Sequence, residues 1–208
     1  MQDYQQALLV DPRYFEARYS RGMLAYEFKD FALAAKDFTQ ALVSQPRSVP
    51  AYTARSLCYI YLKQNKQALA DAMRAVEIEP ETASAYLTRG MVYGYRREYD
   101  LALVDLDRAI ELDPTCSTAY VKRGNTYAYS GQLALAFDDY THALQLDPHS
   151  PTAHYSRGCY YLRVQNLEQA RSDLQWSWDS KPDISAGLLL NWLRLVMQHG
   201  QEREQIAS

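Results

Sequence analysis

Residues 117–148 read STAYVKRGNTYAYSGQLALAFDDYTHALQLDP, and this stretch recurs along the chain. The proline that closes it returns every 34 residues. The prolines in phase are Pro12, Pro46, Pro80, Pro114, Pro148 and Pro182. A fixed period of this length is typical of a stacked array of one supersecondary unit. We therefore expect a chain built from copies of a single motif.

Each full copy holds two runs of apolar residues at helical spacing, separated by a short polar break. In residues 117–148 the break is Ser130-Gly131-Gln132. The closing proline ends the second run, because its ring cannot continue the helical hydrogen-bond ladder and restricts the residue before it. We expect two antiparallel helices of about 14 residues in every unit.

The period predicts half a unit, five complete units and one extra helix. Residues 1–14 match only the second helix of an incomplete unit, and residues 185–208 are expected to form a terminal covering helix and a polar tail, with Gly200 ending the helix. The five complete units are 15–48, 49–82, 83–116, 117–150 and 151–184. Because one helix of such a pair cannot bury its apolar face alone, the mid-unit start suggests a fragment of a longer protein.

Small residues recur in columns that mark close helix contacts. One column is Ala34, Ala68, Ala102, Ala136 and Ala170, and another is Gly22, Gly90, Gly124 and Gly158, with Ser56 in the second unit. Larger aromatic residues recur beside them at Tyr59, Tyr93, Tyr127 and Tyr161. Together with the closing prolines, these columns resemble the tetratricopeptide repeat over nearly the whole chain. The repeated Arg-Gly of the first helix resembles a subset of that family.

The resemblance implies an all-α, right-handed superhelical solenoid of antiparallel helix pairs. It also implies a concave groove lined by the first helix of each pair, and binding of a protein or peptide without catalysis. The clamp of Lys, Asn and Arg residues that holds chaperone carboxylates in some family members is not matched, because Tyr19 and Met23 stand where Lys and Asn are expected.

Two charged columns accompany the repeat. They are Arg21, Arg55, Arg89, Arg123 and Arg157, and Asp37, Asp71, Asp105, Asp139 and Asp173. An arginine in a helix-packing surface needs a carboxylate, because an unpaired buried charge is costly. We expect Arg–Asp pairs, either within a repeat or bridging to the next, that set the register of the array.

A column of tyrosines lies on the face that should line the groove. Tyrosine is stiff and amphipathic, and it is favoured at recognition surfaces. The predicted ligand groove comprises Tyr26, Leu57, Tyr61, Leu87, Met91, Tyr95, Asn125, Tyr129 and Arg163. Such a face suits an extended or helical apolar peptide. The equally weighted alternative is that the tyrosines only pack between adjacent repeats.

The terminal helix is apolar around roughly 220° of its circumference, which is more than a covering helix needs. The excess side carries Leu190, Leu193 and Met197. We interpret this side as a partner or self-association surface. The alternative is that Trp176, Trp178 and the tail bury it.

Several function classes receive no support. The net charge of −3 offers no basic field for nucleic acid. No signal segment and no apolar run of membrane length are present, so no membrane partner is expected. Cys58, Cys116 and Cys159 are interpreted as reduced thiols of a cytoplasmic protein. Because the four histidines lack metal-ligand spacing and there is no phosphate loop, we expect no metal, no cofactor and no catalytic residue.

The sequence therefore predicts a non-catalytic, cytoplasmic scaffold that binds a protein or peptide in the concave groove. Two alternatives remain open. The chain is either the sensor or regulatory array of a larger signalling enzyme, or a self-assembling structural module. In the last case a homo-oligomer would form through the terminal helix or the exposed first helix.

Overall fold

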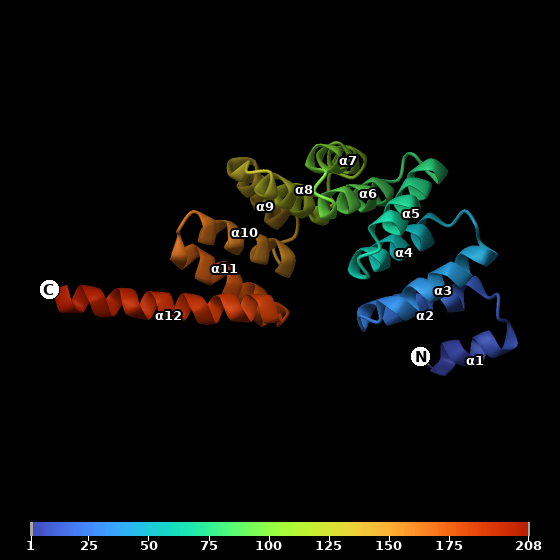
Figure 1. Ribbon diagram of the computed structural model, residues 1–208, viewed down its shortest axis with the longest axis horizontal. Coiled ribbons are helices and arrows are strands. Elements are labelled where there is room, and N and C mark those ends of the chain that lie inside the picture. Colours follow the sequence, from blue (N-terminus) through green and yellow to red (C-terminus); the bar gives the residue numbers. More distant parts are fainter. Residues whose placement is uncertain (1, 208) are drawn as a thin grey trace. The chain divides into compact units, whose positions relative to one another are not determined.

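The computed structural model describes residues 2–207, and the side chains of residues 4–197. Within residues 2–207 the chain forms twelve α-helices and no strand, which confirms the expected all-α helical solenoid. It divides into two compact units, Met1–Pro114 and Thr115–Ser208, and each is described by itself (Figure 1).

The first unit holds one single helix and three helix pairs. Its helices are α1 (Gln2–Val10), α2 (Phe15–Glu27), α3 (Phe31–Ser44), α4 (Val49–Tyr61), α5 (Asn65–Ile78), α6 (Ala83–Tyr95) and α7 (Tyr99–Leu112). The second unit holds two pairs and a long terminal helix. Its helices are α8 (Ser117–Tyr129), α9 (Leu133–Leu146), α10 (Pro151–Arg163), α11 (Leu167–Ser180) and α12 (Ile184–Ala207). Within each unit, the second helix of a pair packs on its own first helix and on the first helix of the next pair.

The turn between the two helices of a pair places one residue in the left-handed region. These residues are Lys29, Lys63, Arg97, Gly131 and Gln165, with φ between 59° and 89°. In the first pair, the Lys29 amide donates to the Tyr26 carbonyl and the Asp30 amide donates to the Ala25 carbonyl, each over 2.9 Å. These bonds satisfy carbonyls that the helix end leaves open, so the turn ends the first helix and starts the second within a few residues.

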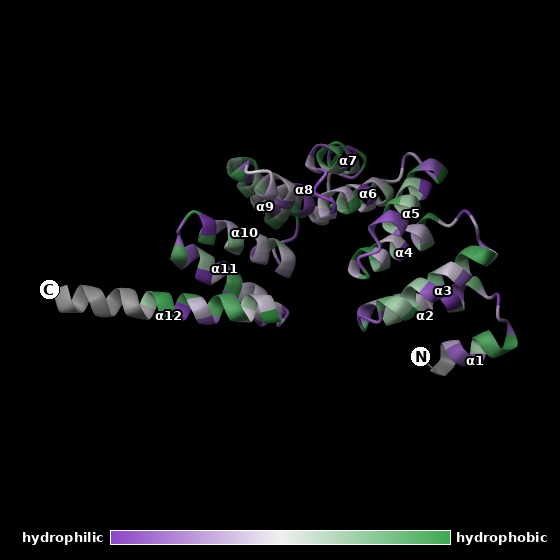
Figure 2. Ribbon diagram, viewed as in Figure 1, coloured by the Kyte–Doolittle hydropathy of each residue, from purple (hydrophilic) through white to green (hydrophobic). Residues whose placement is uncertain are grey.

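The glycine column sits where the two helices of a pair come closest. A Cβ added at Gly124 would lie 2.7 Å from the Tyr140 ring and 3.1 Å from the Ala136 carbonyl oxygen. The alanines of the neighbouring column are fully buried. Figure 2 shows apolar and polar residues interspersed along most of the helices, as expected for helices with one buried side. Glycine and alanine therefore set the distance between the paired backbones.

Every Arg–Asp pair forms within its own repeat, which confirms the pairing and selects between the two expected arrangements. In each of the five repeats the Arg Nε donates to Asp Oδ2 and the Arg Nη2 donates to Asp Oδ1, over 2.6–2.9 Å. The aspartates are buried. Two parallel charge-assisted hydrogen bonds fix both distance and orientation, so each pair ties its first helix to its second.

The terminal helix differs from the expectation at its end. It passes through Gly200 and continues to Ala207. One glycine inside a helix costs only about 1 kcal/mol relative to alanine, and no proline follows it. The residues after it, Gln201–Gln205, are Gln, Glu and Arg, which are favourable in helices.

Candidate functional site

The tyrosine face of the first unit is built from successive repeats. Tyr61 at the end of α4 stacks on Phe31 at the start of α3, with ring centroids 4.2 Å apart. Tyr26 at the end of α2 meets both rings edge-on, at 5.4 Å from Phe31 and 6.0 Å from Tyr61. Burial, followed by the proximity of Tyr61, raises the pKa of Tyr26. These three rings form one aromatic cluster at the helix turns.

The tyrosines of the repeated column remain largely accessible. Tyr61 is 50% exposed and Tyr95 is 56% exposed, while Tyr129 in the second unit is 75% exposed. Tyr61 packs one ring face on Phe31 and leaves half of its surface open.

Aliphatic side chains precede the tyrosines by one turn on the same helices of the first unit, Leu57 before Tyr61 on α4 and Met91 before Tyr95 on α6. Leu57 and Met91 pack against one buried cluster that also contains Ile60 and Val92. Leu87 is half-buried on α6, one turn before Met91. Leu57, Leu87 and Met91 therefore share helix faces with the tyrosines to which the sequence assigns the same part of the groove.

In the second unit, Asn125, Tyr129 and Arg163 lie around Tyr140. The Tyr140 hydroxyl donates to Asn125 Oδ1 over 2.8 Å. Arg163 Nη1 donates to the carbonyl of Ala128 at the end of α8 over 2.7 Å. The Asn125 oxygen and one edge of the Arg163 guanidinium are therefore committed to the protein itself.

Lys122 lies one turn before Asn125 on α8 and was not assigned to the groove from the sequence. It is the cationic member of a column that otherwise holds Ser20, Ala54, Thr88 and Ser156. Burial lowers the pKa of its ammonium group. The replacement of small neutral residues by a lysine in this column is the sequence signal that singles out Lys122.

The prediction that Leu193 belongs to a partner surface on α12 is wrong. This side chain is fully buried against Ala170 and Leu174 of α11. Leu190 is half-buried in the same cluster. Up to Met197, the exposed large apolar residues of α12 lie on another side of the helix, and they are Ile184, Leu188, Trp192 and Leu195. The sequence shows how much of the helix is apolar, but the direction from which α11 approaches decides which residues are covered.

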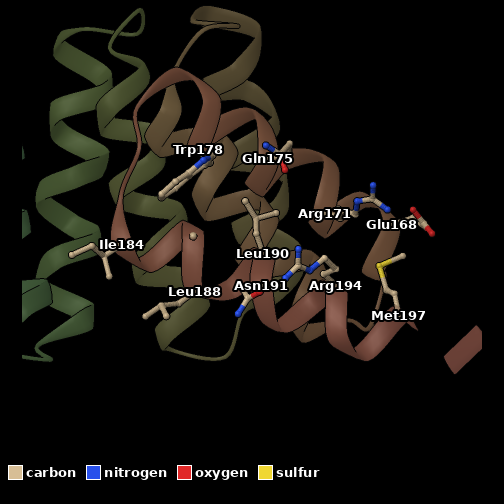
Figure 3. Close-up of a pocket in the computed structure, with 11 residues that line it drawn as sticks. Glu168, Arg171, Gln175, Trp178, Ile184, Leu188, Leu190, Asn191, Arg194 and Met197 are labelled. Carbon is tan, nitrogen blue, oxygen red and sulfur yellow. Dashed lines mark hydrogen bonds between the residues drawn. The ribbon is translucent and has the colours of Figure 1, made fainter. Parts of the chain in front are cut away.

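A cleft of about 800 Å³ runs between α11 and α12. Its walls carry Trp178 and Arg171 from α11, and Leu190, Arg194 and Met197 from α12 (Figure 3). Leu190 and Met197 are thus the two residues of the expected partner surface that border an open space. The two arginines were missed in the sequence, although Arg171 interrupts an apolar column and Arg194 is the charged member of a column that otherwise holds Leu24, Cys58, Val92, Thr126 and Tyr160.

The described side chains offer little for metal binding or thiol chemistry. Among residues 4–197, no group of three His, Cys, Asp or Glu side chains is placed to hold a metal ion. Cys58, Cys116 and Cys159 are free thiols, and burial raises the pKa of Cys58 to about 12.

None of the helices in the described part of the chain combines the length and the apolar character that a membrane span requires.

Several solved structures share this fold. A thermophilic tetratricopeptide repeat protein of Thermus thermophilus has a TM-score of 0.82 at 19% identity, over 87% of this chain and 99% of that one. A tetratricopeptide repeat protein of Parabacteroides merdae has a TM-score of 0.83 at 21% identity, over 92% of this chain and 75% of that one. YrrB, described as a tetratricopeptide repeat protein with an unusual peptide-binding site, has a TM-score of 0.55 at 22% identity, over 90% and 97%.

At these identities the likeness concerns the fold alone, and a comparison with curated protein sequences finds no significant match. Family models give the further evidence. Models described as tetratricopeptide repeat match residues 2–50, 49–82 and 83–116, and a model described as TPR repeat matches residues 124–165. These matches cover most of the sequence, and they identify the chain as a member of the tetratricopeptide repeat proteins.

Proposed function

We propose that this protein is a non-catalytic scaffold that binds a peptide segment of a partner protein on the first-helix face of its repeats. The observation that carries the proposal is the exposure of Tyr61, Tyr95 and Tyr129, which share one position in three successive repeats and are each at least half accessible. Exposed tyrosines combine a large apolar contact area with a hydroxyl and lose little conformational freedom on binding.

The neighbouring residues define the chemistry of the ligand. In the first unit, Leu57, Leu87 and Met91 provide aliphatic surface next to Tyr26, Tyr61 and Tyr95. In the second unit, Asn125, Arg163 and Tyr129 provide polar groups near Tyr140. Apolar anchors of a peptide would suit the first set, and hydrogen-bonding groups of a peptide would suit the second, with each unit considered by itself. A solved protein of similar fold, YrrB, is described as having a peptide-binding site.

The test is a lysate pull-down with mass spectrometry that compares the native chain with the Tyr61→Ala/Tyr95→Ala/Tyr129→Ala variant. The matched control is Met73→Ala/Val104→Ala/Leu135→Ala, which removes exposed apolar side chains from the second helices α5, α7 and α9. Melting curves establish that each variant folds. We expect a partner that is lost only in the tyrosine variant. Equal capture by all three proteins would contradict the proposal.

Self-association is measured in the same preparation. Both terminal helices leave apolar side chains exposed, at Leu9 and Val10 of α1 and at Leu188 and Trp192 of α12. Light scattering over a concentration series reports whether these ends associate. A mass that rises with concentration, and falls with Leu188→Ser/Trp192→Ser, would favour the self-assembling alternative over the peptide scaffold.

A further inference from the structure

The junction between α11 and α12 differs from the preceding junction at one pair of facing positions. Between α9 and α10, Phe137 of the second helix meets Tyr160 of the next first helix, with ring centroids 4.9 Å apart. One period later, the equivalent residues are Arg171 on α11 and Arg194 on α12. Both arginines are exposed, and both line the cleft between their helices. An aromatic contact has thus been replaced by two like charges.

The same two positions are apolar and packed together in the first unit. Ala35 and Cys58 belong to one buried cluster. Leu69 and Val92 belong to the next. Apolar residues therefore occupy both positions at the α3/α4 and α5/α6 junctions, where one repeat packs on the next. At the α11/α12 junction both positions are charged.

The departure leaves the cleft open. Two guanidinium groups cannot close the space by packing, because each is strongly polar and they repel each other. The helices make contact through Leu193 instead, which is buried against Ala170 and Leu174. Beside this contact the cleft of about 800 Å³ keeps an apolar lining of Trp178, Leu190 and Met197 (Figure 3).

The hydrogen bonds of the cleft leave cationic groups available. Arg194 Nη2 donates to Asn191 Oδ1 over 2.9 Å, which uses one of its five N–H groups. Arg171 makes no hydrogen bond or ion pair with any other side chain described in residues 4–197. Glu168 borders the cleft one turn before Arg171 and is the one carboxylate among the lining side chains of residues 4–197. A positive site therefore lies beside apolar surface, on a chain whose net charge is −3.

We propose that this cleft binds an acidic, apolar peptide segment of a partner protein, with an Asp or Glu carboxylate held between Arg171 and Arg194. Guanidinium groups match carboxylates by parallel hydrogen bonds, and two of them on opposite walls can hold one anion between them. Apolar side chains next to that carboxylate pack on Trp178, Leu190 and Met197. A nucleic acid fits poorly, because Glu168 and the negative net charge would face further phosphates.

This site is separate from the tyrosine face. Its residues belong to α11 and α12, whereas the tyrosines lie on α4, α6 and α8. Loss of one site therefore need not affect the other, and the two proposals can fail independently.

The experiment pans a phage-displayed library of random peptides about 12 residues long against the full chain, with the Arg171→Gln/Arg194→Gln variant as counter-selection. Peptides that prefer the native chain are expected to be enriched in Asp or Glu next to Leu, Phe or Trp. The most enriched peptide is then labelled and titrated by fluorescence anisotropy. We expect affinity to fall about 10-fold or more in the Gln variant, and equally when the acidic residue of the peptide becomes Gln.

Three further variants separate charge, shape and folding. Arg171→Lys/Arg194→Lys should retain part of the affinity. Arg171→Phe/Arg194→Tyr restores the aromatic pair of the preceding junction, so it should abolish binding while raising Tm by a few degrees. The control Arg13→Gln/Arg47→Gln removes the same charge from exposed residues outside α11 and α12 and should bind normally.

Any of three outcomes would overturn the proposal. The library could yield no acidic enrichment, the Gln variant could bind as tightly as the native chain, or the Gln peptide could bind as tightly as the acidic one. Displacement of the peptide by millimolar inorganic phosphate but not by acetate would identify a phosphate site, and that result would also overturn the carboxylate assignment.

Discussion

The guanidinium of Arg55 meets the carboxylate of Asp71 through two hydrogen bonds of 2.7 Å. A third bond, from Arg55 Nη1 to Thr39 Oγ1 over 3.0 Å, extends this pair to the preceding repeat. Asp71 is buried, and its side chain is only 8% exposed. The pair therefore joins three helices, α3, α4 and α5, around one carboxylate.

Arg55→Ala is expected to lower the free energy of unfolding by about 3 kcal/mol, because it leaves the buried Asp71 carboxylate without its partner. Chemical denaturation monitored by circular dichroism measures the change. Arg74→Ala is the matched control, because Arg74 pairs with Glu77 at the surface, where both side chains are at least half exposed. Its effect should be small, because an ion pair between exposed side chains is screened by solvent. Equal effects of the two substitutions would show that burial of the pair is unimportant.

Gly124→Ala is expected to destabilise the protein by about 1–3 kcal/mol, because the new Cβ would lie 2.7 Å from the buried Tyr140 ring. Helix propensity alone favours alanine by about 1 kcal/mol, so the sign of the result separates packing from propensity. Thr118→Ala, at an exposed position of the same helix, is the control and should be neutral or slightly stabilising. A Gly124→Ala protein that melts above the native one would refute the close approach of α8 and α9.

Lys63→Gly is expected to stabilise the protein by about 1 kcal/mol. Lys63 has a φ of 59°, which is costly for a residue with a Cβ and free for glycine. The reciprocal change, Gly131→Ala, should destabilise by a similar amount, although a Cβ there would touch nothing within 4 Å. Thermal melts of the two variants measure both shifts, and shifts of the same sign would contradict a backbone origin.

Cys58 is expected to resist iodoacetamide at pH 8 in the folded protein, while the more accessible Cys116 reacts. Desolvation by burial raises the pKa of the Cys58 thiol from the ordinary 9.0 to about 12, so little thiolate is present at pH 8. Peptide mass mapping after alkylation identifies the modified cysteine. Rapid labelling of Cys58 under native conditions would contradict its burial.

The same shift predicts an alkaline loss of stability. Above pH 9 the unfolded chain releases the Cys58 proton while the folded chain retains it, so the free energy of unfolding falls as the pH rises from 9 towards 12. Cys58→Ala should reduce the slope of this fall. Denaturant melts at a series of pH values in this window measure the slope in both proteins.

The repeat architecture could be predicted because its signals are local and recur. The 34-residue spacing of the prolines predicts the helix pair, and the recurring glycines predict where its two helices come closest. In the structure these glycines face Phe38, Leu106, Tyr140 and Leu174. The pairing of Arg and Asp also followed from the cost of an unpaired charge. The sequence does not decide whether the pair lies within a repeat or between repeats. Asp37 is 16 residues from Arg21 and 18 residues from Arg55, and both separations in sequence allow contact.

The terminal helix could not be predicted in the same way. Its residues can be aligned with the repeat, but the rotation of the helix about its own axis depends on how it packs against α11. Leu193 turned inward, and Leu188 and Trp192 turned outward. The cleft lies beside two residues that are distant in sequence, Arg171 and Arg194. Their importance becomes visible only when they are compared with the residues at the equivalent positions of the other repeats.

The Arg–Asp pairs have a consequence for how this chain can change length. Each pair closes inside its own 34-residue segment, so removing or duplicating a segment separates none of these five arginines from its aspartate. Other polar links do cross a boundary. Arg55 donates to the Thr39 hydroxyl, Arg163 donates to the Ala128 carbonyl, and Arg108 pairs with Glu81 at the surface. Each segment therefore keeps its own buried ion pair when gene duplication or protein engineering adds or deletes one segment.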